Sequence, residues 1–192
     1  MLPISLSDYW DAYWGNDAPY YIQARLRDSQ DILMEERIWG EPSEGFEVVQ
    51  NQTVIQERYL YRRLRQYQAF APKYCNYFVH MSLLVKNETQ ITIQETQYGD
   101  DCPYAENVIN YAQWDILTPD PRSNQVIHRN IFQIHWLKKP LVWRVLNRIL
   151  DDGFREATEG LPQYFMENTV NYLNGPPYPG AVYLDRTILW PS

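Results

Sequence analysis

The C-terminal third of the chain carries apolar residues at helical spacing. Between Pro140 and Leu173 they recur every three or four positions, which predicts an amphipathic helix with one wide apolar stripe. The tripeptide Gly-Leu-Pro at 160–162 interrupts the pattern, because proline lacks the N–H that a helix interior needs. We therefore predict one helix up to about Glu159 and a shorter one from Pro162 to Leu173. The stripe of the first helix consists of Leu141, Val142, Val145, Leu146, Ile149, Leu150, Gly153, Phe154 and Ala157.

The middle of the chain alternates between apolar and polar positions, as strands do. Two short helices are predicted before it, at about 5–14 and 18–27. Consecutive strands joined by short turns pair antiparallel. We therefore predict an α+β fold in which one curved antiparallel sheet of about six strands is closed by the long helix across its concave face. The predicted strands cover about 32–39, 54–64, 76–85, 89–97, 104–117 and 125–137.

A curved sheet closed by a single helix leaves an apolar space unless bulky side chains fill it, and such a space can hold a ligand. Asn110 and Asn130 share the faces that line it and could bind a ligand hydroxyl; the alternative is that both are ordinary hydrogen-bonded core amides. Gly153 would allow a ligand or the sheet to approach the helix closely, and tight helix packing would explain it equally well. The predicted apolar lining is Trp39, Leu60, Val108, Trp114, Phe132, Ile134, Trp136, Leu146, Leu150 and Phe154, with Phe70 from a loop.

Composition narrows the classes of function. The 192 residues suit one domain with a sizeable core, and the formal charge of -7 with a pI near 4.9 argues against nucleic acid as a partner. No apolar run approaches the roughly 20 residues that span a bilayer, so we expect a cytoplasmic chain. The 16 Tyr and 7 Trp fit either a large aromatic core or surfaces that are half apolar and half wet.

Little in the sequence suggests catalysis. Cys75 and Cys102 show no metal-ligand spacing and are expected to be free thiols in a reducing compartment. His128 and His135 lie seven residues apart on one predicted strand, so they face opposite sides and cannot share a metal. The sequence contains no nucleophile elbow and no phosphate-binding loop. We therefore predict no catalytic residue, no metal and no cofactor.

Two features suggest contact with a membrane surface. Lys138 and Lys139 precede the long helix, where cations oppose the helix dipole at a typical cost of about 0.3–1 kcal/mol, so a function such as holding lipid headgroups would explain them. Phe70 lies in a predicted loop, and apolar residues on loops often make contacts. We predict that Phe70, Lys138 and Lys139 touch the membrane transiently.

Five short motifs occur along the chain in the order Leu2-Pro3-Ile4-Ser5-Leu6 with Trp10, Ile38-Trp39, Arg58-Tyr59-Leu60-Tyr61, Pro103-Tyr104 and Trp136-Leu137-Lys138-Lys139. Together with the order of the predicted elements, they resemble the VASt domain, the StART-like lipid-binding module of the Lam and Aster sterol transporters. The resemblance covers about residues 2–173 and implies a helix-grip fold with a sterol-sized cavity, sterol transfer at membrane contact sites, and a mobile loop at the cavity entrance. Residues 68–72 lack the glycine expected in that loop.

Two hypotheses about function follow. In the first, residues 1–174 form a non-enzymatic domain that binds a lipid, in particular a sterol, and transfers it between membranes. In the second, the same fold is a structural subunit of a larger, organellar membrane-associated complex. The apolar tail at 175–192 is predicted to pack on the domain or on a protein partner. The two hypotheses differ in whether the space under the long helix is open or filled.

Overall fold

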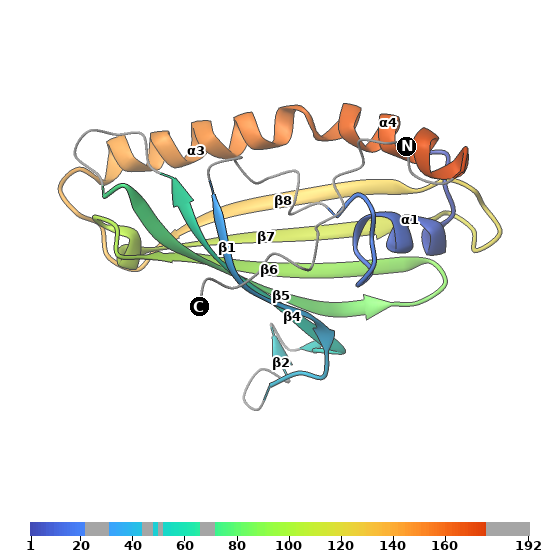
Figure 1. Ribbon diagram of the computed structural model, residues 1–192, viewed down its shortest axis with the longest axis horizontal. Coiled ribbons are helices and arrows are strands. Elements are labelled where there is room, and N and C mark those ends of the chain that lie inside the picture. Colours follow the sequence, from blue (N-terminus) through green and yellow to red (C-terminus); the bar gives the residue numbers. More distant parts are fainter. Residues whose placement is uncertain (22–30, 44–47, 50–51, 66–71, 176–192) are drawn as a thin grey trace.

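The computed structural model describes residues 1–21, 31–43, 48–49, 52–65 and 72–175 (Figure 1). It contains the helix α1 (Leu6–Tyr13), a sheet, and two C-terminal helices, α3 (Trp143–Glu159) and α4 (Leu161–Leu173). A short 3-10 helix, η1 (Ala105–Asn107), precedes β7. The strands are β1 (Ile32–Gly40), β2 (Val48–Val49), β3 (Gln52–Thr53), β4 (Gln56–Arg65), β5 (Tyr74–Lys86), β6 (Gln90–Asp100), β7 (Val108–Leu117) and β8 (Ile127–Trp136).

The predicted α+β class and the six-stranded antiparallel sheet are confirmed. The strand order is β1-β4-β5-β6-β7-β8, and every neighbouring pair is antiparallel. Side chains alternate across such a sheet, so each registered row of residues lies on one face. We call the face toward α1, α3 and α4 the inner face and the opposite one the outer face (Figure 1).

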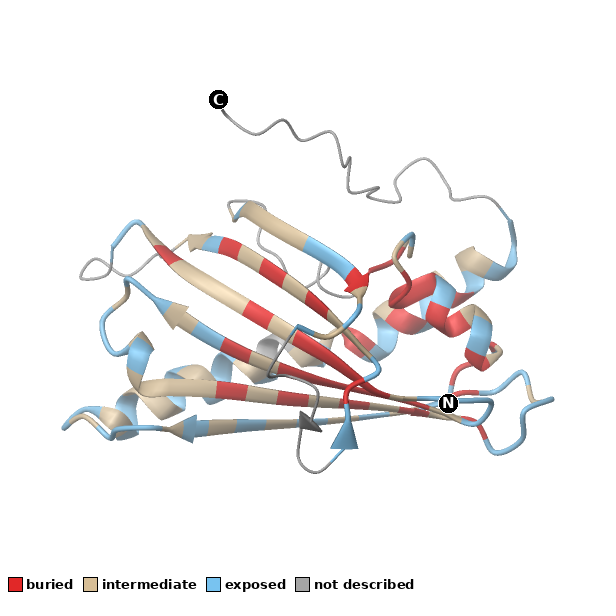
Figure 2. Cartoon of the chain, turned by 90° about the horizontal axis from the view of Figure 1, so that it is seen from below, coloured by how far each residue is buried: buried red, intermediate tan, exposed pale blue. Residues whose placement is uncertain are grey.

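The packed core lies on the inner face at the end of the sheet that holds α1 and α4 (Figure 2). Ser5 caps α1, since its Oγ accepts a hydrogen bond from the Asp8 N–H at 3.1 Å. The Tyr13 hydroxyl donates to the Phe165 carbonyl at 2.9 Å and so joins α1 to α4. The Trp39 indole donates to the Trp14 carbonyl at 2.7 Å. These bonds satisfy the polar atoms of aromatic rings that are otherwise surrounded by apolar side chains.

The C-terminal helices break where the sequence predicts. Gly160 ends α3 and also precedes α4, whose first turn contains Pro162. The first helix starts at Trp143, three residues after the predicted Pro140. It lies along β8, the edge strand, and not across the middle of the sheet (Figure 1). An ideal Cβ on Gly153 would meet no protein atom within 4 Å, so neither close approach of the sheet nor tight helix packing explains that glycine.

One further prediction was wrong, one pair of strands was not predicted, and one predicted helix lies largely outside the described residues. Residues 104–107, predicted as the start of a strand, contain η1, because Tyr104 adopts a left-handed conformation with φ of 69° and turns the chain. The hairpin of β2 and β3 was not predicted. The second N-terminal helix was predicted at 18–27; residues 18–21 are not helical, and 22–27 lie outside the described residues.

The prediction of free thiols was wrong. Cys75 and Cys102 form a disulfide, with their Cα atoms 5.3 Å apart. The pair closes a separation of 27 residues that includes most of the hairpin of β5 and β6. Antiparallel pairing of Asn76 with Asp100 brings the two cysteines together at one end of that hairpin. The sequence could not reveal this, because the spacing says nothing about which strand ends meet.

Candidate functional site

Strand register places the predicted lining residues of the sheet on the inner face. Leu60 stands in one row with Val79 of β5, Gln97 of β6, Asn110 of β7 and Ile134 of β8. The remaining members lie an even number of residues away along β7 and β8, and so share that face. The inward set of strand residues is Leu60, Val108, Asn110, Trp114, Asn130, Phe132, Ile134 and Trp136.

The predicted site residues fall into two groups by burial. Trp39, Leu60 and Trp114 belong to the packed core, where Trp114 meets Trp14 edge-on with ring centroids 5.3 Å apart. Phe70 lies outside the described residues. The other apolar members are half-buried, and Phe132 among them also packs against the core, where its ring centroid is 5.8 Å from that of Trp114. These are Val108, Phe132, Ile134, Trp136, Leu146, Leu150 and Phe154.

Helix α3 turns the predicted face toward the sheet. Phe154 packs on Phe132 with ring centroids 5.6 Å apart, and the Trp136 indole donates a hydrogen bond to Asn147 Oδ1 at 2.8 Å. Among the side chains whose burial is described, none in α3 is buried. Val145 and Ile149, on the flank of the same stripe, are 62% and 51% exposed. The amphipathic helix therefore lies beside apolar residues that it does not seal from solvent.

Two inward amides have unused acceptors. Oδ1 of Asn110 and Oδ1 of Asn130 are both buried and have no hydrogen-bond partner among the described residues. A buried acceptor without a donor costs about 1–3 kcal/mol, so each is a place for a ligand or water donor. Asn110 pairs with Ile134, which is four residues from Asn130 on β8, and so the two amides stand about 13 Å apart along the strands. One ligand hydroxyl can reach only one of them.

A polar network occupies the inner face of β4, β5 and β6. The Tyr77 hydroxyl donates to Gln97 Oε1 at 2.6 Å, and Gln97 Nε2 donates to Glu95 Oε2 at 2.8 Å. Burial raises the pKa of Tyr77 above its usual value, so its phenol stays neutral and keeps the proton that it donates. The sequence analysis did not single out this network. Its signal was the polar pair Glu95 and Gln97 at inward positions of a strand that is otherwise apolar on that side.

Arg58 extends the polar character of this face. Its guanidinium pairs with Glu36 of β1, donates to the Trp14 carbonyl at 3.3 Å, and lies 3.8 Å from the centroid of the Tyr21 ring. The Arg58 side chain is almost fully buried. A buried guanidinium needs such partners, because desolvation of an unpaired charge is costly. One side of the inner face is thus polar, and within the Arg58 guanidinium only Nε lacks a hydrogen-bond partner among the described residues, while the side near α3 is apolar and half-buried.

The lysines predicted to contact a membrane lie between β8 and α3, at the end of the sheet away from α1 and α4 (Figure 1); we call this the loosely packed end. Lys138 and Lys139 are exposed and directly follow β8, and the backbone N–H of Leu137 donates to the Asn107 carbonyl at 2.8 Å. Lys139 Nζ lies 4.8 Å from the centroid of the Trp143 ring at the start of α3. Leu137 and Leu141 are exposed beside these cations. Cations and apolar side chains are therefore mixed at one tip of the molecule.

The predicted positions of the histidines are confirmed. His128 faces inward, where its ring stacks on Trp114 at 5.4 Å and meets Phe165 edge-on at 4.7 Å, whereas His135 is on the outer face. Burial lowers the pKa of His128 to about 4, so its ring is neutral. The described residues contain no group of three or more His, Cys, Asp and Glu side chains placed to hold a metal ion. Within the described part of the chain, no helix combines the length and the apolar character needed to cross a membrane.

Comparison with known proteins adds no relative. No model of a known protein family matches the sequence, and no curated protein matches it significantly. The functional interpretation therefore depends on the geometry of the inner face and on the motifs quoted above.

Proposed function

We propose that this chain is a non-enzymatic lipid-binding domain of StART-like, helix-grip type, which takes up a sterol or a similar flat amphiphile between α3 and the inner face of the sheet. The observation that carries the proposal is the contrast between the two ends of that face. At the end with α1 and α4, side chains such as Trp14 and Trp114 are fully buried. At the end with α3, apolar residues that face one another across β8 and the helix remain half-exposed.

The chemistry of the face fits an amphipathic ligand. Covering the apolar side chains near α3 would stabilise a complex by about 25 cal/mol per Å² of apolar surface removed from water. The unused amide oxygen of Asn110 or Asn130 would accept a hydrogen bond from the ligand hydroxyl. A flat molecule with one hydroxyl group and a large apolar body matches both requirements.

The exposed tip gives a route for exchange with a membrane. Lys138 and Lys139 would meet anionic headgroups, each contributing about 1 kcal/mol near such a surface, and the exposed Leu137 and Leu141 would enter the interface. This tip adjoins the loosely packed end, so a ligand would travel a short distance between membrane and protein. Transfer at contact sites between organelle membranes is the corresponding cellular role.

A matched pair of α3 variants tests the proposal. Leu146→Trp places a bulky ring toward the sheet. Val145→Trp introduces the same ring at the preceding residue, whose side chain is exposed. We expect saturable uptake of dehydroergosterol by the unmodified chain, measured as energy transfer from its tryptophans, loss of uptake in Leu146→Trp, and retention in Val145→Trp. Absence of saturable uptake by the unmodified chain, or equal loss in both variants, would reject lipid binding at this place.

The second candidate is a structural subunit of a larger complex. It is favoured by exposed apolar side chains at the surface, namely Val145 and Ile149 on α3 and Leu141 just before this helix. In that case Val145→Trp would disturb assembly with a protein partner, while the chain alone would take up no sterol. Sterol uptake by the isolated chain therefore separates the two candidates.

A further inference from the structure

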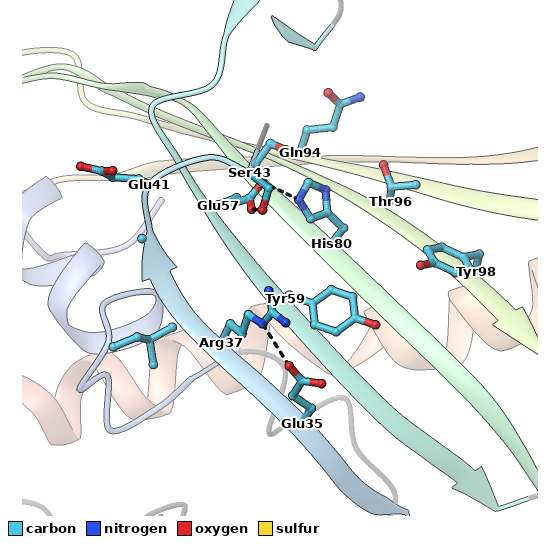
Figure 3. Close-up of a pocket in the computed structure, with 13 residues that line it drawn as sticks. Glu35, Arg37, Glu41, Ser43, Glu57, Tyr59, His80, Gln94, Thr96 and Tyr98 are labelled. Carbon is cyan, nitrogen blue, oxygen red and sulfur yellow. Dashed lines mark hydrogen bonds and ion pairs between the residues drawn. The ribbon is translucent and has the colours of Figure 1, made fainter. Parts of the chain in front are cut away.

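A cleft of about 600 Å³ opens on the outer face of the sheet, opposite the face discussed above (Figure 3). Its floor consists of registered rows across β4, β5 and β6, namely Glu57 with Ser82 and Gln94, and Tyr59 with His80 and Thr96. Residues of β1 and of the segment that follows it form a wall. None of the described residues predicted to bind lipid lines this cleft. Its lining among the described residues is Glu35, Arg37, Ile38, Gly40, Glu41, Ser43, Glu57, Tyr59, His80, Ser82, Gln94, Thr96 and Tyr98.

The cleft is acidic. Among the described residues that line it, the carboxyl groups of Glu35, Glu41 and Glu57 are accompanied by one guanidinium, that of Arg37, which leaves an excess of two negative charges when His80 is neutral. Arg37 is already paired, because its Nε donates to Glu35 Oε1 at 3.0 Å. Glu41 and Glu57 are the remaining carboxylates. Among the described lining residues, the imidazolium form of His80 is the only further cation that could pair with them. The electrostatic potential in the cleft therefore favours a positively charged ligand.

Glu57 is held as a carboxylate. Its side chain is only 15% exposed, with Oε1 accepting a hydrogen bond from Ser43 and Oε2 lying 3.1 Å from His80 Nε2. Burial alone would raise the pKa of Glu57, but the hydrogen bonds from Ser43 and His80 outweigh it and lower that pKa below its usual value. The group is consequently charged at neutral pH and offers acceptor lone pairs only.

Gln94 supplies an independent sign of a missing donor. It is 5% exposed and lines the cleft in the same row as Glu57, yet its Oε1 has no hydrogen-bond partner among the described residues. A buried amide oxygen without a donor is rare, because it gives up its hydrogen bonds to water and forms no hydrogen bond within the protein in return. The floor thus offers the Glu57 carboxylate and this unpartnered amide oxygen as acceptors, and an N–H group of a ligand could donate to both.

Aromatic rings border these acceptors. Phe78 lies between Tyr59 and Tyr98, with ring centroids 6.3 Å and 5.0 Å away, and both tyrosines line the cleft. Burial, and then the neighbouring Tyr98 and Glu35, raise the pKa of Tyr59 to about 12. The phenol therefore stays neutral, and its ring face can interact with a cation or pack on an alkyl chain. Carboxylates beside tyrosine rings suit an organic cation better than a strongly hydrated metal ion.

We propose that this cleft is a second binding site, which takes a small organic ammonium ion of the diamine or polyamine class. An ammonium group has three donors and no acceptor, so it complements Glu57 and the free Oε1 of Gln94. Its alkyl chain would lie against Tyr59 and Tyr98. This site is on the outer face and is independent of lipid binding at α3.

Calorimetric titration of the whole chain with cadaverine tests the proposal, with pentanediol as an uncharged ligand of the same carbon length. We expect saturable binding of the diamine and none of the diol. Absence of saturable heat with cadaverine, or equal binding of the diol, would overturn the proposal. Leu146→Trp, which alters the α3 side only, should bind cadaverine unchanged, so failure of the lipid proposal leaves this result interpretable.

Two variants locate the site and a third controls for overall charge. Glu57→Gln keeps the shape but removes the charge, and Gln94→Leu removes the unpaired acceptor; each should weaken cadaverine binding about tenfold, as expected for loss of a hydrogen bond to a charged group. Glu159→Gln removes the same charge from the exposed surface of α3 and should leave the affinity unchanged. Equal weakening in all three would mean unspecific attraction to an acidic protein, and would refute the site. If Glu57→Gln does not fold, Tyr98→Leu is the second variant. Tyr98 is 39% exposed, and loss of its ring should also weaken cadaverine binding.

Discussion

The Trp136 indole donates a hydrogen bond to Asn147 Oδ1 at 2.8 Å, and this bond fastens α3 to the edge strand β8. Phe132 and Phe154 meet nearby with ring centroids 5.6 Å apart. These two contacts determine which side of α3 faces the sheet, and therefore which residues can meet a ligand.

Replacing Asn147 with alanine should loosen α3 without unfolding the sheet. The loss of one partly buried hydrogen bond lowers the free energy of unfolding by about 1 kcal/mol, and the Trp136 N–H is left without its acceptor. We expect faster amide hydrogen exchange in α3 and unchanged exchange in β5 and β6. Asn168→Ala, in α4, is the matched control; a uniform increase in exchange over the whole chain would contradict this role of the bond.

The neutral ring of His128 should make the fold sensitive to acid. Its pKa is about 4 in the folded chain and about 6.5 when unfolded, so between these values only the unfolded chain gains the proton. Stability is therefore lost as the pH falls from about 6.5, by roughly 3 kcal/mol at pH 4. Urea denaturation at several pH values should show a shallower acid dependence in His128→Phe than in the unmodified chain.

The control for that measurement is His135→Phe, which changes an exposed histidine on the other face. It should keep the acid dependence of the unmodified chain. If His128→Phe and the unmodified chain lose stability in parallel, the buried ring is not the group responsible.

Replacing Gly153 with alanine should stabilise the protein. The glycine is in the middle of α3, and an added Cβ meets nothing within 4 Å. Alanine has the higher helix propensity, so we expect a gain of about 0.5–1 kcal/mol in the free energy of unfolding. If thermal denaturation shows a loss of stability, the position makes a contact in solution, and the close-approach hypothesis for this glycine returns.

Removing the disulfide should destabilise the chain. Cys102→Ser breaks the bond to Cys75 and frees a loop of 27 residues in the unfolded chain, at a typical cost of about 2–4 kcal/mol. The unmodified protein in the presence of a reductant should show the same lower unfolding midpoint as the variant. Reaction of both cysteines with an alkylating reagent in the native, non-reduced protein would contradict the pairing.

The two inward amides make distinguishable predictions for the ligand. Because Asn110 and Asn130 stand about 13 Å apart, a single hydroxyl reaches only one of them. One of the variants Asn110→Leu and Asn130→Leu should weaken sterol binding about fivefold, the size expected for one hydrogen bond, while the other has little effect. Equal effects of the two would argue against a single fixed orientation of the ligand.

Local patterns in the sequence predicted the sheet well. Alternation assigns Tyr59 and Leu60 to opposite faces, and turn residues bound each strand, so all six strands of the sheet and their antiparallel order follow from short-range chemistry. The break near Gly160 also follows, because proline in a helix has a local steric effect.

Long-range pairings were less accessible. The stripe on α3 shows that the helix covers something apolar, but amphipathicity does not say that the partner is the edge strand β8. The disulfide depends on where two strand ends meet. The cleft on the outer face depends on the pairing of β1 with β4 and of β4 with β5. The second pairing brings together Glu57 and His80, which are 23 residues apart in the sequence.

The junction at Gly160 separates two helices that are held in different ways. Tyr13 bonds to the Phe165 carbonyl and to Thr169, and these anchor α4 in the core. Helix α3 is fastened chiefly through Trp136 and Phe132, near solvent. The fully buried aromatic rings Tyr9, Tyr13, Trp14 and Trp114 all lie outside α3. If the proposed uptake of a ligand moves α3 away from β8 about Gly160, these rings would keep their neighbours, and opening would not require unfolding of the core.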